Sequence, residues 1–413
     1  MHKGLPNRGN EYRKVILMEE FDAIIVGAGP AGLTAARKLA EGKAKVLCID
    51  KKQEIGVPKR CAEGLGLAWM QRLNLKPDKK WCMQEIHGAA LYAPSLKSVE
   101  IDFKKVSGYV IERRIFEKEL AKQAAAKRAL LKTKCHASSF ERKNGKVVVG
   151  CTEQGKEIQY SAPLIIACDG TESLTARRLG LDTKISLNDI DSGYQYEMAN
   201  ISFNKPQFIH LFFGKNVAPR GYCWIFPKGK DIANVGIGIT GQEEKTAKEY
   251  LDRFIQAHPG IRKGSIIEVN AGTIPVGGFL EDMAADNLLV SGDAAHQVNP
   301  IHGGGIGIAM EAASLASDVA LKAIAAKDFS YGFLKQYNPL WFETRGNKLK
   351  KILKQRHMLE NLTDDNFETL AKAVTGDDVM KIAEGDLVGS AKMVTKKLIT
   401  HPKLAKVMLK YLR

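Results

Sequence analysis

The alternation of apolar and polar residues divides this chain into regions of different character. Short, largely apolar runs at residues 24–26, 44–49, 164–168 and 287–290 predict parallel strands that are buried on both faces. Residues 192–240 contain longer strand-like runs with few helix signals, which predicts an antiparallel sheet. The chain is therefore expected to contain two sheets of different kinds.

The first apolar run leads directly into a glycine-rich turn and a predicted helix. Gly27, Gly29 and Gly32 are spaced to give a tight turn, close backbone approach to a pyrophosphate, and close packing of helix on strand. The helix that starts at Pro30 would direct its N-terminal N–H groups and positive dipole end at phosphates. The pattern predicts a dinucleotide site, and its alternative is a glycine turn without a ligand.

The second apolar run follows at the distance that a crossover helix requires and ends at Asp50. This acid is placed to accept a hydrogen bond from a ribose hydroxyl, or else it is a solvated turn residue. Beyond it, residues 55–64 show neither helical nor strand periodicity and predict an extended loop. Such a loop either lies along a bound cofactor or forms an ordinary turn with a buried cysteine.

A second ligand signal lies near residue 300. Asp293 follows a predicted strand and could accept from a polyol chain, while the N–H groups of Gly304, Gly305 and Ile306 begin a predicted helix. Positive dipole at that place suits the negative charge of a reduced flavin ring. His296 and His302 lie beside these turns, where packing or surface roles are more common than chemistry.

Two further segments shape the predicted nucleotide region. Arg113 lies at a strand-to-helix junction that faces the ligand end of the sheet, either as a phosphate contact or as a surface residue. Glycine turns at residues 144–145 and 154–155 predict a β-meander in place of a crossover helix. Segments 86–92 and 99–103 are expected to leave the nucleotide sheet and begin a second layer.

Aromatic residues concentrate in the predicted antiparallel sheet. They form either its core or the wall of an apolar substrate cavity: Tyr222, Trp224, Phe226, Phe212 and Phe213. Beyond residue 330 the chain predicts helices with basic, amphipathic runs at 348–356 and 392–410. These runs form either a solvated helical cap on the cavity or a surface for a membrane or partner.

Charge and cysteine content narrow the class of protein. The chain has 62 Lys and Arg against 46 Asp and Glu, a formal net charge of +16, which favours anionic partners or is simply a solvated basic surface. Nucleic acid is disfavoured because no matching motif is present. Seven cysteines without a Cys-x-x-Cys pair indicate reduced thiols and no metal site. Without a membrane-spanning run, we expect a cytoplasmic protein that is peripheral to the membrane.

Several motifs together resemble known flavoproteins. Residues 27–32, Asp169-Gly170 and Gly292-Asp293 with Gly304-Gly305 are similar to the FAD sites of the aromatic-hydroxylase-like group. Residues 58–64, and the strand 222–227 followed by Gly236-Ile237-Gly238, resemble the FAD-dependent geranylgeranyl reductase family. The similarity extends over nearly the whole chain and is greatest to the archaeal digeranylgeranylglycerophospholipid reductases, although chlorophyll-type reductases share much of it.

The resemblance implies an α/β (α+β overall) architecture. Residues 1–20, basic with only a brief apolar patch, are interpreted as a leader that precedes the similarity. Residues 21–180 with 270–330 would form a discontinuous, Rossmann-like FAD-binding domain carrying the inserted β-meander. Residues 181–269 would form an antiparallel-sheet substrate domain, and residues 331–413 a C-terminal helical region.

The resemblance also implies site residues. FAD contacts would come from ten positions: Ala31, Asp50, Cys61, Ala62, Gly64, Arg113, Ala137, Asp293, Gly305 and Ile306. Tyr222, Trp224 and Phe226 would border the prenyl cavity.

The implied reaction is saturation of isoprenoid C=C bonds by hydride from reduced FAD, with a proton from Cys61, Tyr222 or water. Trp224 would stabilise developing positive charge. Expected partners are a prenylated phospholipid, the membrane surface, and an electron donor that is either an acidic protein such as ferredoxin or NAD(P)H. The alternatives are an FAD-dependent monooxygenase and a lipid-binding flavoprotein without enzyme activity.

Overall fold

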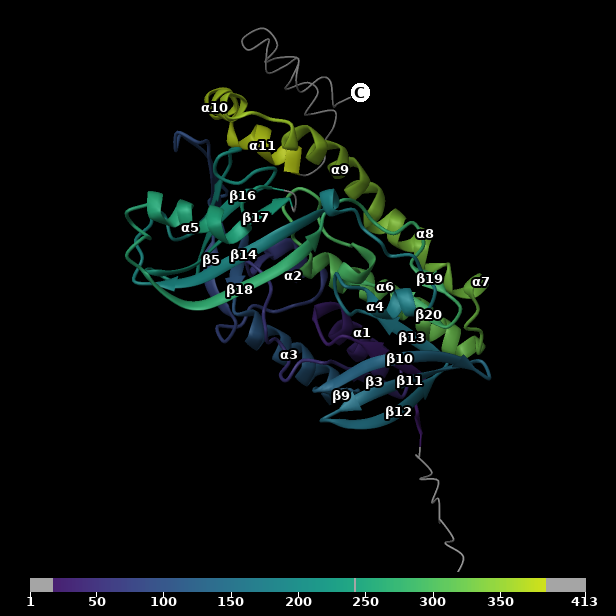
Figure 1. The fold of residues 1–413 in the computed structure, drawn as a ribbon. Coiled ribbons are helices and arrows are strands. Elements are labelled where there is room, and N and C mark those ends of the chain that lie inside the picture. The colour runs from purple at the N-terminus through teal and green to yellow at the C-terminus, as the bar shows by residue number, and fades with distance from the viewer. Residues whose placement is uncertain (1–17, 241–242, 384–413) are drawn as a thin grey trace, which may run out of the picture.

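The chain folds into a nucleotide-type region and a large, mainly antiparallel sheet that lie side by side (Figure 1). The computed structural model describes residues 18–240 and 243–383. Helices near the C-terminus run along one side, from the first region to the far end of the second (Figure 1). The predicted fold class is confirmed.

The parallel sheet forms where the sequence contains continuous apolar runs. Its central strands are buried along their whole length, as expected when both faces of a sheet are covered. Only β19 pairs antiparallel to its neighbour. The strands, in their order across the sheet, are β19 (Ala284–Ala285), β20 (Leu288–Val290), β13 (Leu164–Ala167), β2 (Ala23–Val26), β3 (Val46–Ile49) and β9 (Leu130–Lys132).

Helices cover one face of this sheet and the meander covers the other. Helix α1 (Pro30–Glu41) packs between α3 (Arg113–Ala126) and α6 (Ile306–Ala326) and contacts β2 and β3. The predicted meander is present, because Asn144-Gly145 and Gln154-Gly155 all have positive φ and form hairpin turns. Its strands are β10 (Cys135–Lys143), β11 (Lys146–Glu153) and β12 (Lys156–Ala162), with β1 (Glu19–Glu20) added beside β12.

The second large sheet has seven strands. Helix α5 (Ala247–Ala257) covers one face by packing Leu251 and Phe254 in a core with Val235 and Ile237. The strands, in order across the sheet, are β18 (Ser265–Pro275), β14 (Ile190–Ala199), β17 (Ile232–Thr240), β16 (Tyr222–Pro227), β15 (Phe208–Phe212), β6 (Gly88–Tyr92) and β7 (Ser98–Asp102).

This sheet extends beyond the predicted substrate segment. As expected, β6 and β7 leave the nucleotide region, but they join the antiparallel sheet through a parallel pairing of β6 with β15. The sheet therefore includes two strands, β6 and β7, from outside the range 181–269. A parallel pair between residues far apart in sequence has no local signature. The predicted domain boundaries stay predictions.

A small sheet and short helices link the two regions. The small sheet contains β4 (Gly64–Gly66), β8 (Gly108–Ile111) and β5 (Cys82–Ile86). The remaining helical segments are α2 (Leu67–Arg72), α4 (Leu174–Arg178), η1 (Leu187–Asp189), η2 (Gly292–Ala295), α7 (Tyr331–Leu334), α8 (Tyr337–Trp341), η3 (Phe342–Gly346), α9 (Asn347–Glu360), α10 (Asp364–Ala373) and α11 (Gly376–Ala383).

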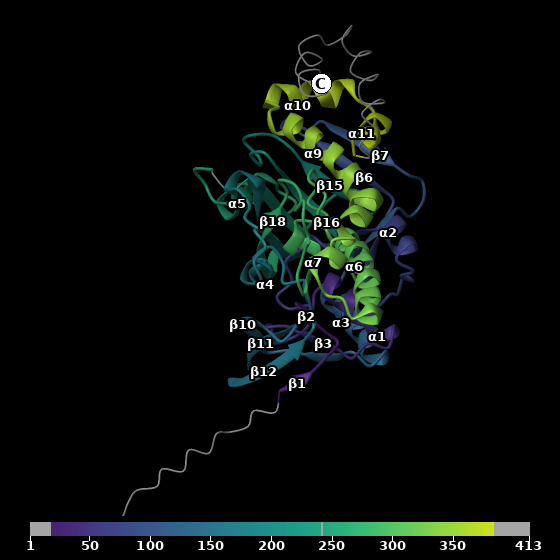
Figure 2. The same cartoon turned by 90° about the vertical axis from the view of Figure 1, so that its right-hand side faces the viewer.

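Both views place the meander and the pair α10–α11 at opposite ends of the molecule (Figures 1 and 2). Residues 1–17 of the predicted leader and the predicted basic run 392–410 lie outside the described residues. Within the described ranges, no helix has both the length and the hydrophobicity needed to cross a membrane.

Gly32 tests the close packing on which the first turn depends. A Cβ added there would lie 1.8 Å from the carbonyl oxygen of Gly27, a backbone atom that no side-chain rotation can move. The overpacking cost of about 1–3 kcal/mol exceeds the helix-propensity gain of about 1 kcal/mol. We therefore expect Gly32→Ala to lower the free energy of unfolding, measured by urea denaturation.

Gly29→Ala is the matched control, because a Cβ there meets no heavy atom within 4 Å. Its unfolding curve should shift by no more than about 0.5 kcal/mol. Superimposable curves for Gly32→Ala and the unmodified protein would contradict the packing role.

Candidate functional site

One cavity of about 980 Å³ joins the parallel sheet, the seven-stranded sheet and the C-terminal helices. Nearly all the predicted site residues line it: Gly27, Gly29, Ala31, Asp50, Cys61, Ala62, Gly64, Arg113, Ala137, Tyr222, Trp224, Phe226, Asp293, Gly304, Gly305 and Ile306. Gly32 is not part of the lining and instead packs against Gly27. The individual roles of these residues stay predictions.

Two helix N-termini face this cavity. Gly29 precedes α1 and Gly305 precedes α6, and neither helix has a side-chain cap for its first N–H groups. Unpaired N–H donors and the positive helix dipole favour anionic ligands at such positions. At Gly29 the space is open, so a ligand can reach the backbone closely. At the other helix, the ring of Trp69 packs against Gly307, where a Cβ would lie 2.2 Å from the ring.

Asp50 joins the second strand to the glycine turn. Its carboxylate accepts hydrogen bonds from the backbone N–H groups of Ala28 and Lys52, each at 2.8 Å. The side chain is almost fully buried but belongs to the cavity wall. Asp50 therefore fixes the turn, and its predicted contact with a ribose hydroxyl would be an additional one.

Asp293 and Arg113 lie in the deep part of the site. Burial raises the pKa of Asp293, and the nearby charge of Arg113 offsets this only in part. The Arg113 side chain donates to the carboxylate of Glu117 and, at 3.3 Å, to the carbonyl of Arg60. Hydroxyl groups of a polyol chain can donate to the Asp293 carboxyl from the cavity, and such hydrogen bonds favour its ionised form.

The two predicted histidines differ in position. His302 lines the cavity, and burial lowers its pKa to about 4, so the ring is neutral near pH 7. Its Nδ1 accepts from the N–H of Gly304 at 3.1 Å. His296 does not line the cavity and is buried in a left-handed turn with φ 57°. Its side chain therefore has a packing role.

Every carbonyl of the loop from Arg60 to Glu63 accepts a hydrogen bond. The donors are, in chain order, the Arg113 Nη1, Gln195 Nε2 at 3.1 Å, Asn234 Nδ2 at 3.2 Å and the Ile111 N–H at 2.8 Å. A loop with each carbonyl paired to a different element has little freedom to move. This pairing holds Cys61 and Ala62 at the cavity wall.

The Glu63 side chain holds the same loop in place by accepting four hydrogen bonds. Its carboxylate accepts from the N–H of Arg113 at 2.7 Å, from Asn234 at 2.8 Å, and from the ammonium groups of Lys59 and Lys228 at 3.2 and 3.1 Å. Glu63 is fully buried and has φ 72°, a strained conformation for a residue with a side chain. The dense pairing keeps the residue in that conformation.

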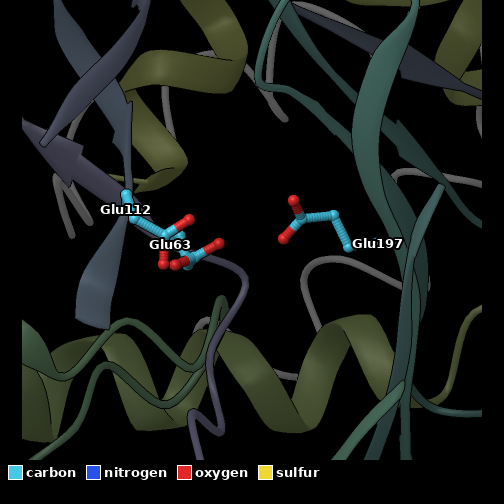
Figure 3. A group of neighbouring side chains, drawn as sticks. All are labelled: Glu63, Glu112 and Glu197. Atoms are coloured by element: carbon cyan, nitrogen blue, oxygen red, sulfur yellow. The ribbon is translucent and has the colours of Figure 1, made fainter. Parts of the chain in front are cut away.

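Glu63 belongs to a buried ion cluster. The carboxylates of Glu63, Glu112 and Glu197 converge from three different elements (Figure 3). Lys228 contacts all three at 3.1, 2.7 and 3.0 Å, and Lys59 contacts Glu63 and Glu197. The three carboxylates have a geometry that could hold a metal ion, but the ammonium groups of Lys59 and Lys228 already lie among them, and Arg114 also pairs with Glu112.

These lysines also control the acidity of the cluster. Burial raises the pKa of Glu112, but the hydrogen bond and charge of Lys228 outweigh burial and lower it to about 2. The same balance, with Lys59 as well, lowers the pKa of Glu197. Both groups are therefore ionised at neutral pH, and the cluster ties loop 60–63, α3 and the seven-stranded sheet together.

The aromatic side chains of β16 face the cavity. Tyr222, Trp224 and Phe226 alternate along the strand and line the cavity together with Phe213. Phe212 does not line it and packs in the sheet core against Phe254, so the cavity interpretation is wrong for that residue. Strand alternation explains the split, because neighbouring residues point to opposite faces.

Trp224 is held on two sides. Its ring lies against Gly236, where an added Cβ would be 2.4 Å from the indole, and its Nε1 donates to Gln195 Oε1 at 2.9 Å. Gln195 also donates to the Cys61 carbonyl. Gln195 therefore links β16 to the loop that carries Cys61. The close contact of the Trp224 ring with Gly236 explains why the motif has a glycine at that position after the strand.

Cys61 and Tyr222 both retain their protons at neutral pH. Burial raises the pKa of the Cys61 thiol, although Arg113 partly offsets this, and burial also raises the pKa of the Tyr222 hydroxyl. The Tyr222 hydroxyl donates to the carbonyl of His302 at 2.7 Å, and the Cys61 sulfur accepts from the N–H of Glu63. Both are proton carriers on the cavity wall.

The donor set fits an FAD molecule. Two uncapped helix N-termini suit a pyrophosphate and a reduced ring, and a protonatable carboxyl lies beside them. In addition, the Asp169 Oδ1 atom is buried at the cavity wall without a hydrogen bond among the described residues.

Comparisons with known proteins agree with this arrangement. Residues 22–91 match the FAD binding domain family, and residues 189–274 match the geranylgeranyl reductase catalytic domain. Digeranylgeranylglycerophospholipid reductase 2 of Methanosphaera stadtmanae is 40% identical over 384 residues, which cover 92% of this chain and 97% of that protein. The chain belongs to the geranylgeranyl reductase family. It is an FAD-dependent reductase.

Other relatives of this reductase are similar over comparable lengths. The digeranylgeranylglycerophospholipid reductase of Methanocaldococcus jannaschii is 39% identical, with 92% of this chain and 96% of that protein covered. A crystal structure of a geranylgeranyl bacteriochlorophyll reductase-like protein from Thermoplasma acidophilum has a TM-score of 0.86 and 33% identity, covering 95% and 100% of the two chains. The flavin-dependent brominase Bmp2 has a TM-score of 0.68 at 15% identity, which shows a shared fold alone.

The structure adds cavity residues that the sequence of this reductase did not single out. Trp69 and Gln195 line the cavity, and so do Phe367 and Leu370 of α10. The one sequence signal for Gln195 is an amide between two aromatic residues, Tyr194 and Tyr196, in a predicted strand. The other three look like ordinary amphipathic core residues in the sequence.

Lys228→Met tests the buried ion cluster of this reductase. Removing one partner of a buried ion pair costs about 3–5 kcal/mol of folding free energy, and we expect a loss of that size at neutral pH. The pKa of Glu112, lowered to about 2 from an ordinary value of 4.5, stabilises the fold above pH 4.5. That stabilisation is lost as the pH falls from 4.5 towards 2. Because Lys228→Met removes the charge that lowers the pKa of Glu112, the free energy of unfolding of the variant should fall less over this pH range.

Urea unfolding at a series of pH values measures both effects. Lys248→Met is the control, because its pair with Asp252 is exposed and contributes at most about 0.5 kcal/mol. If Lys228→Met gave a pH profile parallel to that of the unmodified reductase, the coupling of Glu112 to Lys228 would be refuted.

Proposed function

We propose that this reductase saturates the isoprenoid C=C bonds of geranylgeranyl chains, with digeranylgeranylglycerophospholipids of archaeal ether-lipid synthesis as substrates. The observation that carries the proposal is one continuous cavity, which connects the flavin-type site to an apolar wall of aromatic side chains. The names of the relatives that match over most of their length support this substrate class.

The cavity residues would position the substrate. When bound and reduced, FAD supplies a hydride donor. An isolated alkene is a poor hydride acceptor, so its alignment and the exclusion of water contribute much of the rate. Trp224, fixed by Gln195 and Gly236, presents an aromatic face that stabilises positive charge developing on the alkene.

A proton must reach the second alkene carbon. The Cys61 thiol and the Tyr222 hydroxyl both line the cavity and keep their protons because burial raises their pKa. We propose Cys61 or Tyr222, or a water molecule held by them, as the donor. Neutral donors avoid a buried unpaired charge before the reaction.

The basic surface would serve the partners of the reaction. A net charge of +16 favours contact with anionic lipid headgroups and with an acidic electron donor such as ferredoxin, while NAD(P)H is the alternative donor. Peripheral association with the membrane would bring the enzyme to its lipid substrate.

Anaerobic turnover tests the proposal. Dithionite-reduced enzyme is incubated with a digeranylgeranylglycerophospholipid, and the lipid is analysed by mass spectrometry. We expect stepwise gains of hydrogen pairs and reoxidation of the flavin at a matching rate, because each saturated bond consumes one hydride and one proton. Free geranylgeranyl alcohol and a geranylgeranylated chlorophyll precursor are run in parallel to separate lipid-type from chlorophyll-type reductases.

Other outcomes correspond to the alternative functions. An oxygenated product that requires air would indicate a monooxygenase. Lipid binding without flavin reoxidation would indicate a lipid-binding flavoprotein. Either result, without saturated product, overturns the proposed reaction.

A further inference from the structure

The cavity continues past β16 to the C-terminal helices, which lie outside both matched family segments. Phe367, Leu370 and Val374 line it from α10 and the residue after it, and Val379 and Met380 line it from α11. Apolar residues of β6, β7 and β15 line the same cavity. We call this part of the cavity the distal arm.

A continuous row of aromatic rings leads into the distal arm. Ring centroids are 6.4 Å apart for Phe226 and Trp224, 5.8 Å for Trp224 and Tyr222, 5.8 Å for Tyr222 and Phe213, and 5.8 Å for Phe213 and Phe367. All five rings line the cavity. The ring of Phe226 lies against Gly64, which directly follows the loop that carries Cys61. We call residues 60–63 the flavin loop, and the aromatic row connects this loop to α10.

The orientation of α10 is fixed by hydrogen bonds at its outer side. The Asp364 carboxylate accepts from the Lys215 N–H and, at 3.0 Å, from Asn216 Nδ2. The Glu368 carboxylate accepts from the N–H and hydroxyl of Ser95, both at 2.6 Å. These contacts orient α10 so that one face of it points towards the cavity. That face carries Phe367, Leu370 and Val374 at helical spacing, and we call these three residues the stripe.

The stripe is incompletely covered by protein. Phe367, Leu370 and Val374 are each only partly buried although they face the interior of the cavity. None of the described cavity-lining residues of α10 and α11 is charged, so the arm suits an uncharged, apolar ligand. An elongated apolar ligand that already lies along the aromatic row would cover the stripe.

We infer that α10 and α11 complete the isoprenoid-binding site and that the aromatic row guides one chain from the flavin loop to Leu370. The inference rests on the proposed function for its ligand, an isoprenoid chain. A chain long enough to pass Phe213 contacts α10, whereas a short chain ends before it. The helices therefore contribute to discrimination by chain length.

Leu370→Trp tests this inference, with Lys372→Trp as the matched control on the exposed side of the same helix. Binding to the oxidised, FAD-loaded enzyme is measured by titration calorimetry in detergent, with digeranylgeranyl (C20) and digeranyl (C10) glycerophospholipids as the two probes. We expect Leu370→Trp to weaken binding of the C20 lipid at least tenfold, with less than a twofold change for the C10 lipid. Lys372→Trp should change neither.

Thermal unfolding and flavin content establish that each variant is folded. If Leu370→Trp does not fold, Val374→Phe places bulk at the next position of the same stripe and carries the same expectation. Variants on the stripe that bind both lipids as Lys372→Trp does would overturn the inference. An equal loss of affinity for the C20 and C10 lipids would also overturn the claim that the helices discriminate by chain length.

The binding assay separates this inference from the proposed function, because it requires no turnover. If the unmodified enzyme binds the C20 lipid through Leu370 but never saturates it, the inferred binding site is supported and the proposed reaction is refuted. If the enzyme saturates the lipid but the stripe variants bind it as the control does, the proposed reaction is supported and the inferred binding site is refuted.

Discussion

The site depends first on the buried ion cluster around Glu63. Three carboxylates and two ammonium groups meet where loop 60–63, the start of α3 and the seven-stranded sheet come together. Ions removed from water are stable only with near-complete pairing, so the cluster permits essentially one relative placement of these elements. The left-handed conformation of Glu63 and the hydrogen-bonded carbonyls of the loop follow from that placement.

That placement brings two chemically different surfaces into one cavity. One surface has the uncapped N-termini of α1 and α6 and the carboxyl of Asp293, which suit phosphate, polyol and reduced-ring groups. The other is the aromatic face of β16. Gln195 joins them physically, because its two amide ends bind the Cys61 carbonyl and the Trp224 indole. A flavin reductase for alkenes needs both surfaces at a fixed separation.

Local motifs predicted their own structure well. Helix α1 begins at Pro30 and helix α6 at Ile306 as predicted, and the glycine turns of the meander form as expected. The predicted cofactor residues gather at one cavity, with Gly32 as a packing residue instead. The sequence left a choice open where the outcome rested on a distant partner. Phe212 packs in the sheet core, one of its two predicted roles, and β6 leaves the nucleotide region to pair with a strand far ahead in the sequence.

The sequence by itself determined the dinucleotide turn, the parallel strands, and the family with its FAD cofactor, because spacing of glycines and apolar runs acts over a few residues. Tertiary structure alone decided that Lys59 and Lys228 pair with Glu63, Glu112 and Glu197, and that Phe367 continues the aromatic row of β16. These contacts join residues far apart in the chain. Their formation depends on strand register and helix docking, which carry no local signature.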